Sequence, residues 1–381
     1  MHCYSFLRSP AGKKFGRLVV DEIQDTVNPH PERVQVWTKF FDIAVTAPQQ
    51  RILLTATFPP HLEKAFFSTT ICEKNTLVIR ATTDRPELGY HVVEANPKAS
   101  FTRNTTALIA ALEKQLRDDE CIIVFFQSSD ECEQFHAAYA CALYHSKLPA
   151  SGHGSKPSHL HDWDSGEKKV LAATTAASVG IDRLYIKFTV VVQSTYGLLT
   201  YGQEVGRGGR RGEHSYAILL QQQNYHRVHR FTGLFDNKDT NCIAAMSAYG
   251  GNMATCRRAV LLKTFDGANL CDKRRGRLTC KQIPGANLCD ICDPSSQMAQ
   301  LIRSALDNAN QKLKAPALPL PLRTPQPLAG PSVTAAPASH SQDYYFDNDE
   351  LTPEMLMELD KISDAYKVRY NAWLYERKNI K

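Results

Sequence analysis

Short apolar runs that end in polar residues recur along this chain of 381 residues. The runs are RLVV (17–20), RILL (51–54), IIVFF (122–126), VLAA (170–173), FTVVV (188–192) and YAILL (216–220). Runs of this kind are typical of strands that are buried on both faces of a sheet, and the helical stretches between them supply the covering layers. We therefore predict an α/β fold with a mainly parallel sheet.

The composition is that of a soluble globular protein, with 43% apolar residues and no apolar run long enough for a membrane span. The first residues, MHCYSFLRSP, lack the apolar core of a signal peptide, so we expect an intracellular protein without a membrane partner. The net charge is +6, although residues 343–360 carry seven acids and no base. A basic body is weak support for a polyanionic partner.

A glycine-rich turn, QEVGRGGRRG (203–212), lies between the last two apolar runs and carries Arg207 and Arg210. Arginine keeps its charge and presents a planar fork of donors, which suits the negative charge of a transferring phosphoryl group. A solvated basic turn explains the same composition equally well.

Two other runs deliver reactive side chains to what would be the carboxyl ends of strands. The first ends in Asp21 and Glu22, where one carboxylate can hold Mg²⁺ and its neighbour can polarise an attacking water. The second ends in Thr55, Ala56 and Thr57. A capped strand end with two solvated acids explains the first pair about as well.

In chain order, these segments resemble the motifs of superfamily 2 helicases. VVDE and LLTATF resemble the second and third motifs. The segments downstream resemble segments of the RecQ family of DNA helicases. VIRATTDRPELGYHVVE (78–94) is similar to the joint between the two motor lobes, and ALYHSKL (142–148) is similar to a segment that follows it. VLAATTAASVGID (170–182) is similar to the fifth motif, and QEVGRGGR (203–210) is similar to the sixth. The resemblance covers roughly residues 17–294.

The resemblance implies two RecA-like lobes that close on ATP with Mg²⁺ and move along DNA in the 3′ to 5′ direction. The implied catalytic residues are Asp21, Glu22, Gln203, Arg207 and Arg210. The implied residues for coupling or DNA-backbone contact are Thr55, Thr57, Thr174, Thr175, Gly180 and Asp182. In a eukaryote the expected location is the nucleus, and otherwise the cytoplasm.

Five of the eleven cysteines crowd into residues 256–292. Cys289 and Cys292 form a C-x-x-C turn, and Cys256 opens a predicted helix, so a closed four-thiolate zinc site is expected with Cys280 as the fourth ligand. Cys271 competes with Cys280, since the hexamer GANLCD occurs at 267–272 and again at 285–290. Unrelated reduced thiols are the alternative. Cys-Arg-Arg followed by Cys-Asp-x-Cys is a further RecQ-like feature.

Basic residues decorate this cysteine-rich segment and include Arg257, Arg258, Lys263, Lys273, Arg274, Arg275, Arg277 and Lys281. They could follow a DNA backbone, or they could form the solvated face of a small domain.

We predict a partial first lobe (1–88), a complete second lobe (89–223), a small helical zinc-binding module (224–294), a proline-rich disordered linker (295–342) and an acidic patch with an amphipathic helix (343–381). In the last segment Thr352 is a good N-cap, and Leu351, Met355 and Leu359 recur at helical spacing. This helix would dock on the body or on a partner protein.

The phosphate-binding sequence G-x-x-x-x-G-K-[ST] does not occur in the chain. By resemblance we expect an N-terminally truncated motor that hydrolyses little ATP. Ile23 and Gln24 also replace the Ala-His that usually follows Asp-Glu in the family, so coupling to DNA is in doubt. The alternative is a catalytically inactive nucleic-acid-binding or protein-interaction module. An RNA-directed helicase is disfavoured by the Cys-Arg-Arg and Cys-Asp-Ile-Cys segments.

Overall fold

The computed structural model describes residues 17–26, 50–69, 76–178, 181–193, 196–222, 242–267 and 279–310. The chain divides into two units, Met1–Ala315 and Pro316–Lys381, and all described residues belong to the first. The described residues do not include Gly180, Cys271 or residues 343–381. The predictions of a helix in 343–381 and of a partner protein for it therefore lie outside the described residues. No helix within the described ranges has the length and apolar character needed to cross a bilayer.

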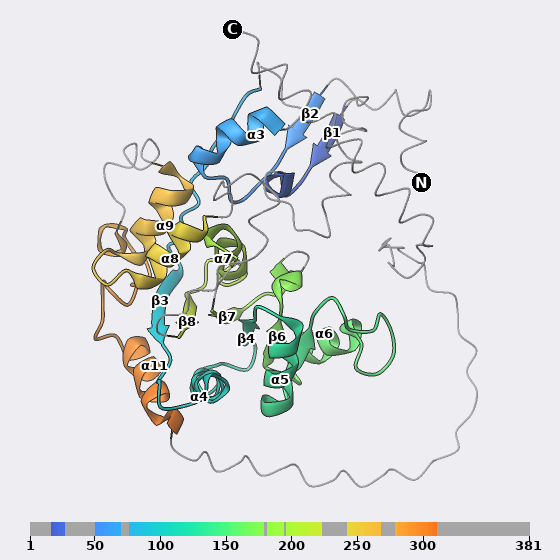
Figure 1. Cartoon of the computed structure of the whole chain (residues 1–381), viewed down its shortest axis with the longest axis vertical. Helices are drawn as coiled ribbons and strands as arrows, with labels where there is room; N and C mark the ends of the chain where they lie inside the picture. The colour runs from blue at the N-terminus through green and yellow to red at the C-terminus, as the bar shows by residue number, and fades with distance from the viewer. Residues whose placement is uncertain are drawn as a thin grey trace, which may run out of the picture. The chain divides into compact units, whose positions relative to one another are not determined.

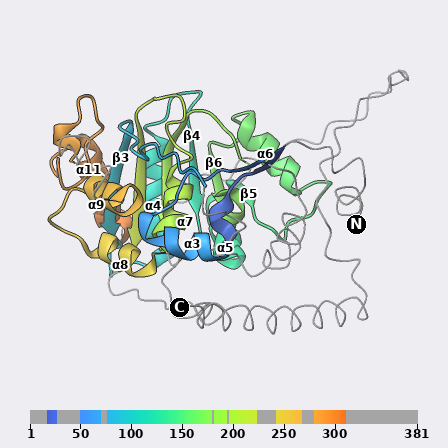
Figure 2. The same ribbon diagram turned by 90° about the horizontal axis from the view of Figure 1, so that it is seen from above.

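The main sheet has six strands in the order β3-β8-β7-β4-β6-β5, and every neighbouring pair is parallel. The strands are β3 (Leu88–Glu94), β4 (Cys121–Phe125), β5 (Ala142–Tyr144), β6 (Val170–Ala173), β7 (Ile186–Val192) and β8 (Ser215–Gln221). Figure 2 shows β3, β4, β6 and β5 in this sequence across the sheet. The predicted α/β fold with a parallel sheet is confirmed.

Both faces of this sheet are buried, as the uninterrupted apolar runs predict. Successive residues of β4 point to opposite faces, so that Ile123 and Phe125 enter one core while Ile122 and Val124 enter the other. The first core is covered by α6 (Lys156–Asp164), α7 (Leu198–Val205), α8 (Ile243–Gly251) and α9 (Arg257–Phe265), and the second by α4 (Phe101–Glu113), α5 (Ser129–Tyr139) and α11 (Gln297–Asp307). Figure 1 shows α7, α8 and α9 on the opposite side of the strands from α4.

Serine residues cap four of the covering helices, α4, α5, α6 and α11. Ser100, Ser128 and Ser155 each have an extended backbone, and each hydroxyl accepts a hydrogen bond from the backbone N–H three residues on, at 3.2–3.4 Å. Such caps satisfy an amide that the helix leaves free, and each contributes about 1 kcal/mol. They fix where the chain leaves the sheet and turns into a helix.

A smaller parallel sheet pairs β1 (Arg17–Val20) with β2 (Gln50–Leu53). Around it lie three short helices: η2 (Ile23–Thr26), η4 (Pro60–Leu62) and α3 (Glu63–Thr69). Val20, Ile23 and Phe66 form the core of this part. The two strands are the apolar runs that the sequence placed before Asp21 and Thr55.

The helix α11 corrects the predicted linker. Its buried residues Ala299, Ile302, Ala305 and Leu306 recur at helical spacing, and Ser296 caps its first turn. The side chain of Asn96 donates to the carbonyl of Leu306 at 3.2 Å, which ties the helix to the end of β3. Residues 297–310, including the short η8 (Asn308–Asn310), are therefore part of the folded body, and the linker prediction is wrong for them.

Candidate functional site

The acidic end of β1 places Glu22 beside the chain that leaves β2. The amide of Ile23 donates to the carbonyl of Leu54 at 3.0 Å, and the amide of Glu22 donates to Asp21 Oδ1 at 2.9 Å. Glu22 has a φ of +52°, a conformation that residues other than glycine seldom adopt and that costs about 1 kcal/mol or more. The local fold therefore fixes the backbone from which the Glu22 side chain leaves the strand end.

Gln203 in α7 reaches this carboxylate. Its Nε2 lies 3.3 Å from Glu22 Oε2, which also accepts a hydrogen bond of 2.5 Å from Gln24. Gln203 and Glu22 are 181 positions apart in the chain. Folding thus brings the acidic strand end beside the start of the glycine-rich turn at 203–212, which we call the arginine turn. The sequence predicted that these two segments act together.

Arg207 follows α7 and is nearly buried, with 9% of its surface exposed. Its Nη1 donates to the carbonyl of Ile181 at 2.8 Å, and its Nη2 donates to the carbonyl of Ser178. Burial lowers the pKa of this guanidinium, nearby Arg210 lowers it further, and Glu22 acts in the opposite direction. Arg207 is therefore not part of a solvated turn, because it is buried and both of its Nη atoms are bonded to the loop after β6.

Arg210 lies at the surface and forms an ion pair with Asp182. The Asp182 side chain is 74% exposed, so this pair adds little stability. Between the two arginines, Gly209 has a φ of +65°, and a Cβ there would lie 2.9 Å from Glu87 Cγ. Only glycine fits this position without a shift of the chain.

The threonines after β2 also lie beside α7. Thr57 donates its backbone amide to Thr55 Oγ1 at 3.2 Å, which closes a tight turn. Thr57 is buried, its own hydroxyl has no hydrogen-bond partner, and its methyl group lies 3.6 Å from the position of a Cβ on Gly202. The sequence-predicted Thr55-Ala-Thr57 turn is therefore packed against the helix that carries Gln203.

Thr174 and Thr175 follow β6 and are half-buried. The amide of Thr174 donates to the carbonyl of Tyr144 at 3.1 Å, and Thr175 begins the short helix η5 (Thr175–Ser178). The other end of η5 supplies the Ser178 carbonyl that accepts from Arg207. The two threonines are thus linked to the arginine turn through η5.

Sequence reasoning missed Glu204, which lies between Gln203 and the arginines. It is 1% exposed, and neither carboxyl oxygen has a hydrogen-bond partner. Burial raises its pKa from 4.5 to about 8. Its place inside the otherwise apolar face of LLTYGQEV is the signal that could have identified it, because the neighbours Tyr201 and Val205 are also buried.

We expect replacement of Glu204 by glutamine to flatten the pH dependence of stability. A carboxyl whose pKa is raised on folding destabilises the fold as pH rises from the unfolded pKa, here 4.5, to the folded one, about 8. The stability advantage of the Glu204→Gln variant over the parent should therefore grow by at most about 4 kcal/mol between pH 5 and pH 8. Urea unfolding at both pH values measures it. The exposed control Glu94→Gln should show no such growth, and an advantage for Glu204→Gln that stays constant would contradict the expectation.

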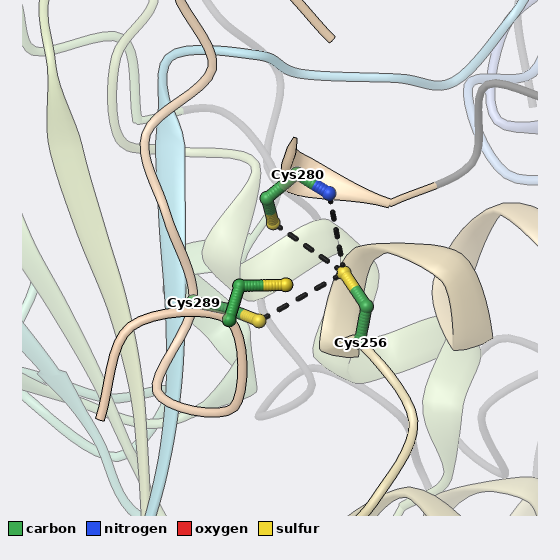
Figure 3. A group of neighbouring side chains, drawn as sticks. Cys256, Cys280 and Cys289 are labelled. Carbon is green, nitrogen blue, oxygen red and sulfur yellow. Dashed lines mark hydrogen bonds between the residues drawn. The ribbon is translucent and has the colours of Figure 1, made fainter. Parts of the chain in front are cut away.

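Four cysteines gather where α9, η7 (Cys280–Gln282) and the Cys289–Cys292 turn meet. Their sulfur atoms all lie within 4.8 Å of one another, with 3.4 Å between Cys256 and Cys280 and 3.8 Å between Cys256 and Cys289. Figure 3 shows three of these side chains turned toward a common point. A zinc ion holds four thiolates at about 2.3 Å, which places the sulfurs about 3.8 Å apart. The residues fit a closed tetrahedral site.

The two arginines after Cys256 have a role that sequence reasoning missed. Arg257 is 2% exposed and makes a bidentate ion pair with Asp290, at 3.0 Å and 3.1 Å. Arg258 is 1% exposed and pairs with Asp84 at 2.7 Å. Neither the DNA-backbone prediction nor the solvated-face prediction holds for these two residues, because Arg257 and Arg258 are buried and form ion pairs inside the fold.

Part of the chain is similar to known helicases. Residues 104–212 match the family described as the helicase conserved C-terminal domain. The chain is 28% identical to the RecQ-like DNA helicase blm-1 of Caenorhabditis elegans over 58% of this chain and 22% of that protein. It is 26% identical to the RecQ-like DNA helicase BLM of Xenopus laevis, over 68% and 19% respectively. Among solved structures, S. cerevisiae Dbp5 bound to RNA and ADP BeF3 aligns with a TM-score of 0.47 and 16% identity, over 77% of this chain and 64% of that one.

The family match assigns residues 104–212, which contain four of the six strands of the parallel sheet, to a helicase C-terminal domain. The similarity to these relatives supports the RecQ family, which the motifs indicated. The chain spans 22% and 19% of the lengths of the two curated relatives above.

Proposed function

We propose that the chain is part of a RecQ-type, ATP-dependent DNA helicase that moves in the 3′ to 5′ direction. The observation that carries the proposal is the contact of 3.3 Å between Gln203 and Glu22, beside an arginine turn. A carboxylate and fixed cations converging on one site suit phosphoryl transfer, in which catalysis is mostly positioning and charge stabilisation.

In this proposal each residue has a defined task toward MgATP, which would supply the phosphoryl group. Asp21 would hold Mg²⁺, and Glu22, whose backbone is fixed at the strand end, would orient and deprotonate the attacking water. Gln203, Arg207 and Arg210 would engage the γ-phosphate. Arg207 would have to leave the carbonyls of Ser178 and Ile181 to do so, which makes its release a conformational step.

DNA is the proposed partner of the segments after β2 and β6. Thr55, Thr57, Thr174, Thr175, Gly180 and Asp182 would contact the DNA backbone or link it to the nucleotide, and a nuclear location would follow in a eukaryotic cell. The cluster of Cys256, Cys280, Cys289 and Cys292 would hold a structural zinc ion and brace the second lobe.

The 381-residue chain alone is expected to hydrolyse little ATP, because its sequence contains no G-x-x-x-x-G-K-[ST] loop. The longest product of the gene should be assayed beside it, with DNA and RNA as separate cofactors and with 3′-tailed and 5′-tailed duplexes. In that product we expect DNA-stimulated hydrolysis, unwinding of the 3′-tailed duplex, and a loss of about 10²-fold or more in kcat for Glu22→Gln or Arg210→Ala.

Three results would oppose this proposal. Robust hydrolysis by the 381-residue chain that Glu22→Gln abolishes would refute the expected inactivity. Preference for RNA or for a 5′ tail would refute the substrate or the direction. DNA binding without hydrolysis in every product would favour the second candidate function, a catalytically inactive nucleic-acid-binding or protein-interaction module. The commitment of both Nη atoms of Arg207 to loop carbonyls is the observation that favours this candidate.

A further inference from the structure

The turn that carries Arg207 is held by Arg85, which lies three residues before β3. Arg85 Nη2 donates to the carbonyl of Gly208 at 2.7 Å, and its Nη1 donates to the carbonyl of Gly206 at 3.3 Å. These carbonyls belong to the residues on either side of Arg207. A guanidinium is a rigid fork, so one side chain that bridges both carbonyls fixes the spacing and direction of the peptide units around Arg207.

Glu87 completes the contact between this segment and the turn. Its carboxylate pairs with Arg85 Nε, so all three guanidinium nitrogens are used. The carbonyl of Glu87 accepts from the amide of Ser215 at 3.0 Å, at the start of β8. The turn is therefore held on one side by Arg85 and anchored just beyond its end by the neighbouring strand.

The backbone at Arg85 is itself held in place by Arg258 of α9. Arg258 Nη1 donates to the carbonyl of Arg85 at 2.6 Å and to Asp84 Oδ1 at 2.7 Å, while Nη2 donates to the carbonyl of Leu88 at 2.7 Å. Because Arg258 is buried and its helix begins directly after Cys256, the backbone at Arg85 has little freedom to move. A continuous set of hydrogen bonds thus runs from α9 to the arginine turn.

We propose that Arg85 is a positioning residue for Arg207. The proposal rests on the proposed function, in which Arg207 meets a phosphate. Arg85 touches no nucleotide itself. It keeps the peptide units of Gly206 and Gly208 in place, so that Arg207 can exchange the carbonyls of Ser178 and Ile181 for a phosphate while the turn keeps its shape.

Hydrogen–deuterium exchange of the 381-residue protein tests this role without hydrolysis. The amides of Gly206, Arg207 and Gly208 donate to carbonyls of α7 at 3.0–3.2 Å and report on the turn. In Arg85→Ala we expect these amides to exchange at least about tenfold faster. Arg85→Lys should restore part of the protection, because an ammonium group is a compact point charge that matches the pair of carbonyls less well than a guanidinium fork.

The matched control is Arg80→Ala. Arg80 lies on the same segment and pairs with Glu63, and its other hydrogen bond is to the carbonyl of Phe58. Exchange at the turn should not change in this variant, and exchange in β4 should not change in any variant. Unaltered exchange at the turn in Arg85→Ala would overturn the proposal, as would an equal acceleration in β4 or in Arg80→Ala. Because no nucleotide is used, the exchange result can be interpreted even if the helicase proposal fails. In the same way, failure of the Arg85 proposal does not contradict the helicase proposal.

Discussion

Replacing Cys280 by serine is expected to reduce bound zinc from one ion per chain to almost none. Cys280 is 1% exposed, and its sulfur lies 3.4 Å from that of Cys256, within a group of four cysteines whose sulfurs lie within 4.8 Å of one another. Structural zinc sites contribute about 10–16 kcal/mol of apparent binding free energy to the folded state, so the variant should also lose the fold around α9. Zinc per chain is measured by native mass spectrometry, and unfolding by the thermal midpoint with and without a chelator.

Cys271→Ser is the informative comparison, because Cys271 lies in the other copy of the GANLCD hexamer and competed for the same ligand position in the sequence. We expect it to retain a full complement of zinc. Cys132→Ser, in the buried core away from the cluster, controls for the loss of any thiol. Full zinc retention in Cys280→Ser would sink the assignment of the fourth ligand.

Replacement of Arg257 by alanine is expected to cost about 3–5 kcal/mol of unfolding free energy. The change leaves the Asp290 carboxylate, which is 17% exposed, without its bidentate partner, and it removes a donor at 2.6 Å from the carbonyl of Tyr249. Asp290 also accepts from the amide of Val92 in β3, so the loss reaches the sheet. Urea unfolding gives the difference in free energy.

The contrast for this experiment is Arg117→Ala. Arg117 also pairs with a carboxylate, that of Glu120, but its side chain is 79% exposed, and a pair of this kind contributes about 1 kcal/mol or less. A double variant, Arg257→Met with Asp290→Asn, should recover part of the lost stability because no buried charge is then left unpaired. Equal costs for Arg257→Ala and Arg117→Ala would show that the buried pair carries no special weight.

The sheet could be predicted from sequence because residues buried on both faces leave a direct pattern. The run IIVFF has no polar position, and in the structure every residue of β4 is buried. Local patterns also identified the Cys289–Cys292 turn. The choice between Cys280 and Cys271 could not be made from spacing, since each lies on a segment of a length that can fold back to Cys256.

The role of the paired arginines depended on contacts that no local pattern encodes. Arg257 finds Asp290 33 positions later, and Arg258 finds Asp84 174 positions earlier. Arginine is a surface residue on average, so a sequence reading places both in water. Glu204 was missed although its place in the apolar face of LLTYGQEV was a local signal, and the degree of its burial depends on how α7 packs. The helix α11 is a different case. Its apolar residues recur at helical spacing in the sequence, but the segment adjoins the proline-rich stretch and was assigned to the linker.

The segment before β3 has one further consequence. The Arg80 side chain is bonded to Glu63 and to the carbonyl of Phe58, both near α3, whereas Thr82 and Thr83 are bonded to Asp266 at the end of α9, at 2.7–2.9 Å. Only Ala81 separates the two sets of anchors. Four soft backbone torsions, from ψ of Arg80 to φ of Thr82, lie between the Cα atoms of these two anchored residues, so any pivot between them has few degrees of freedom.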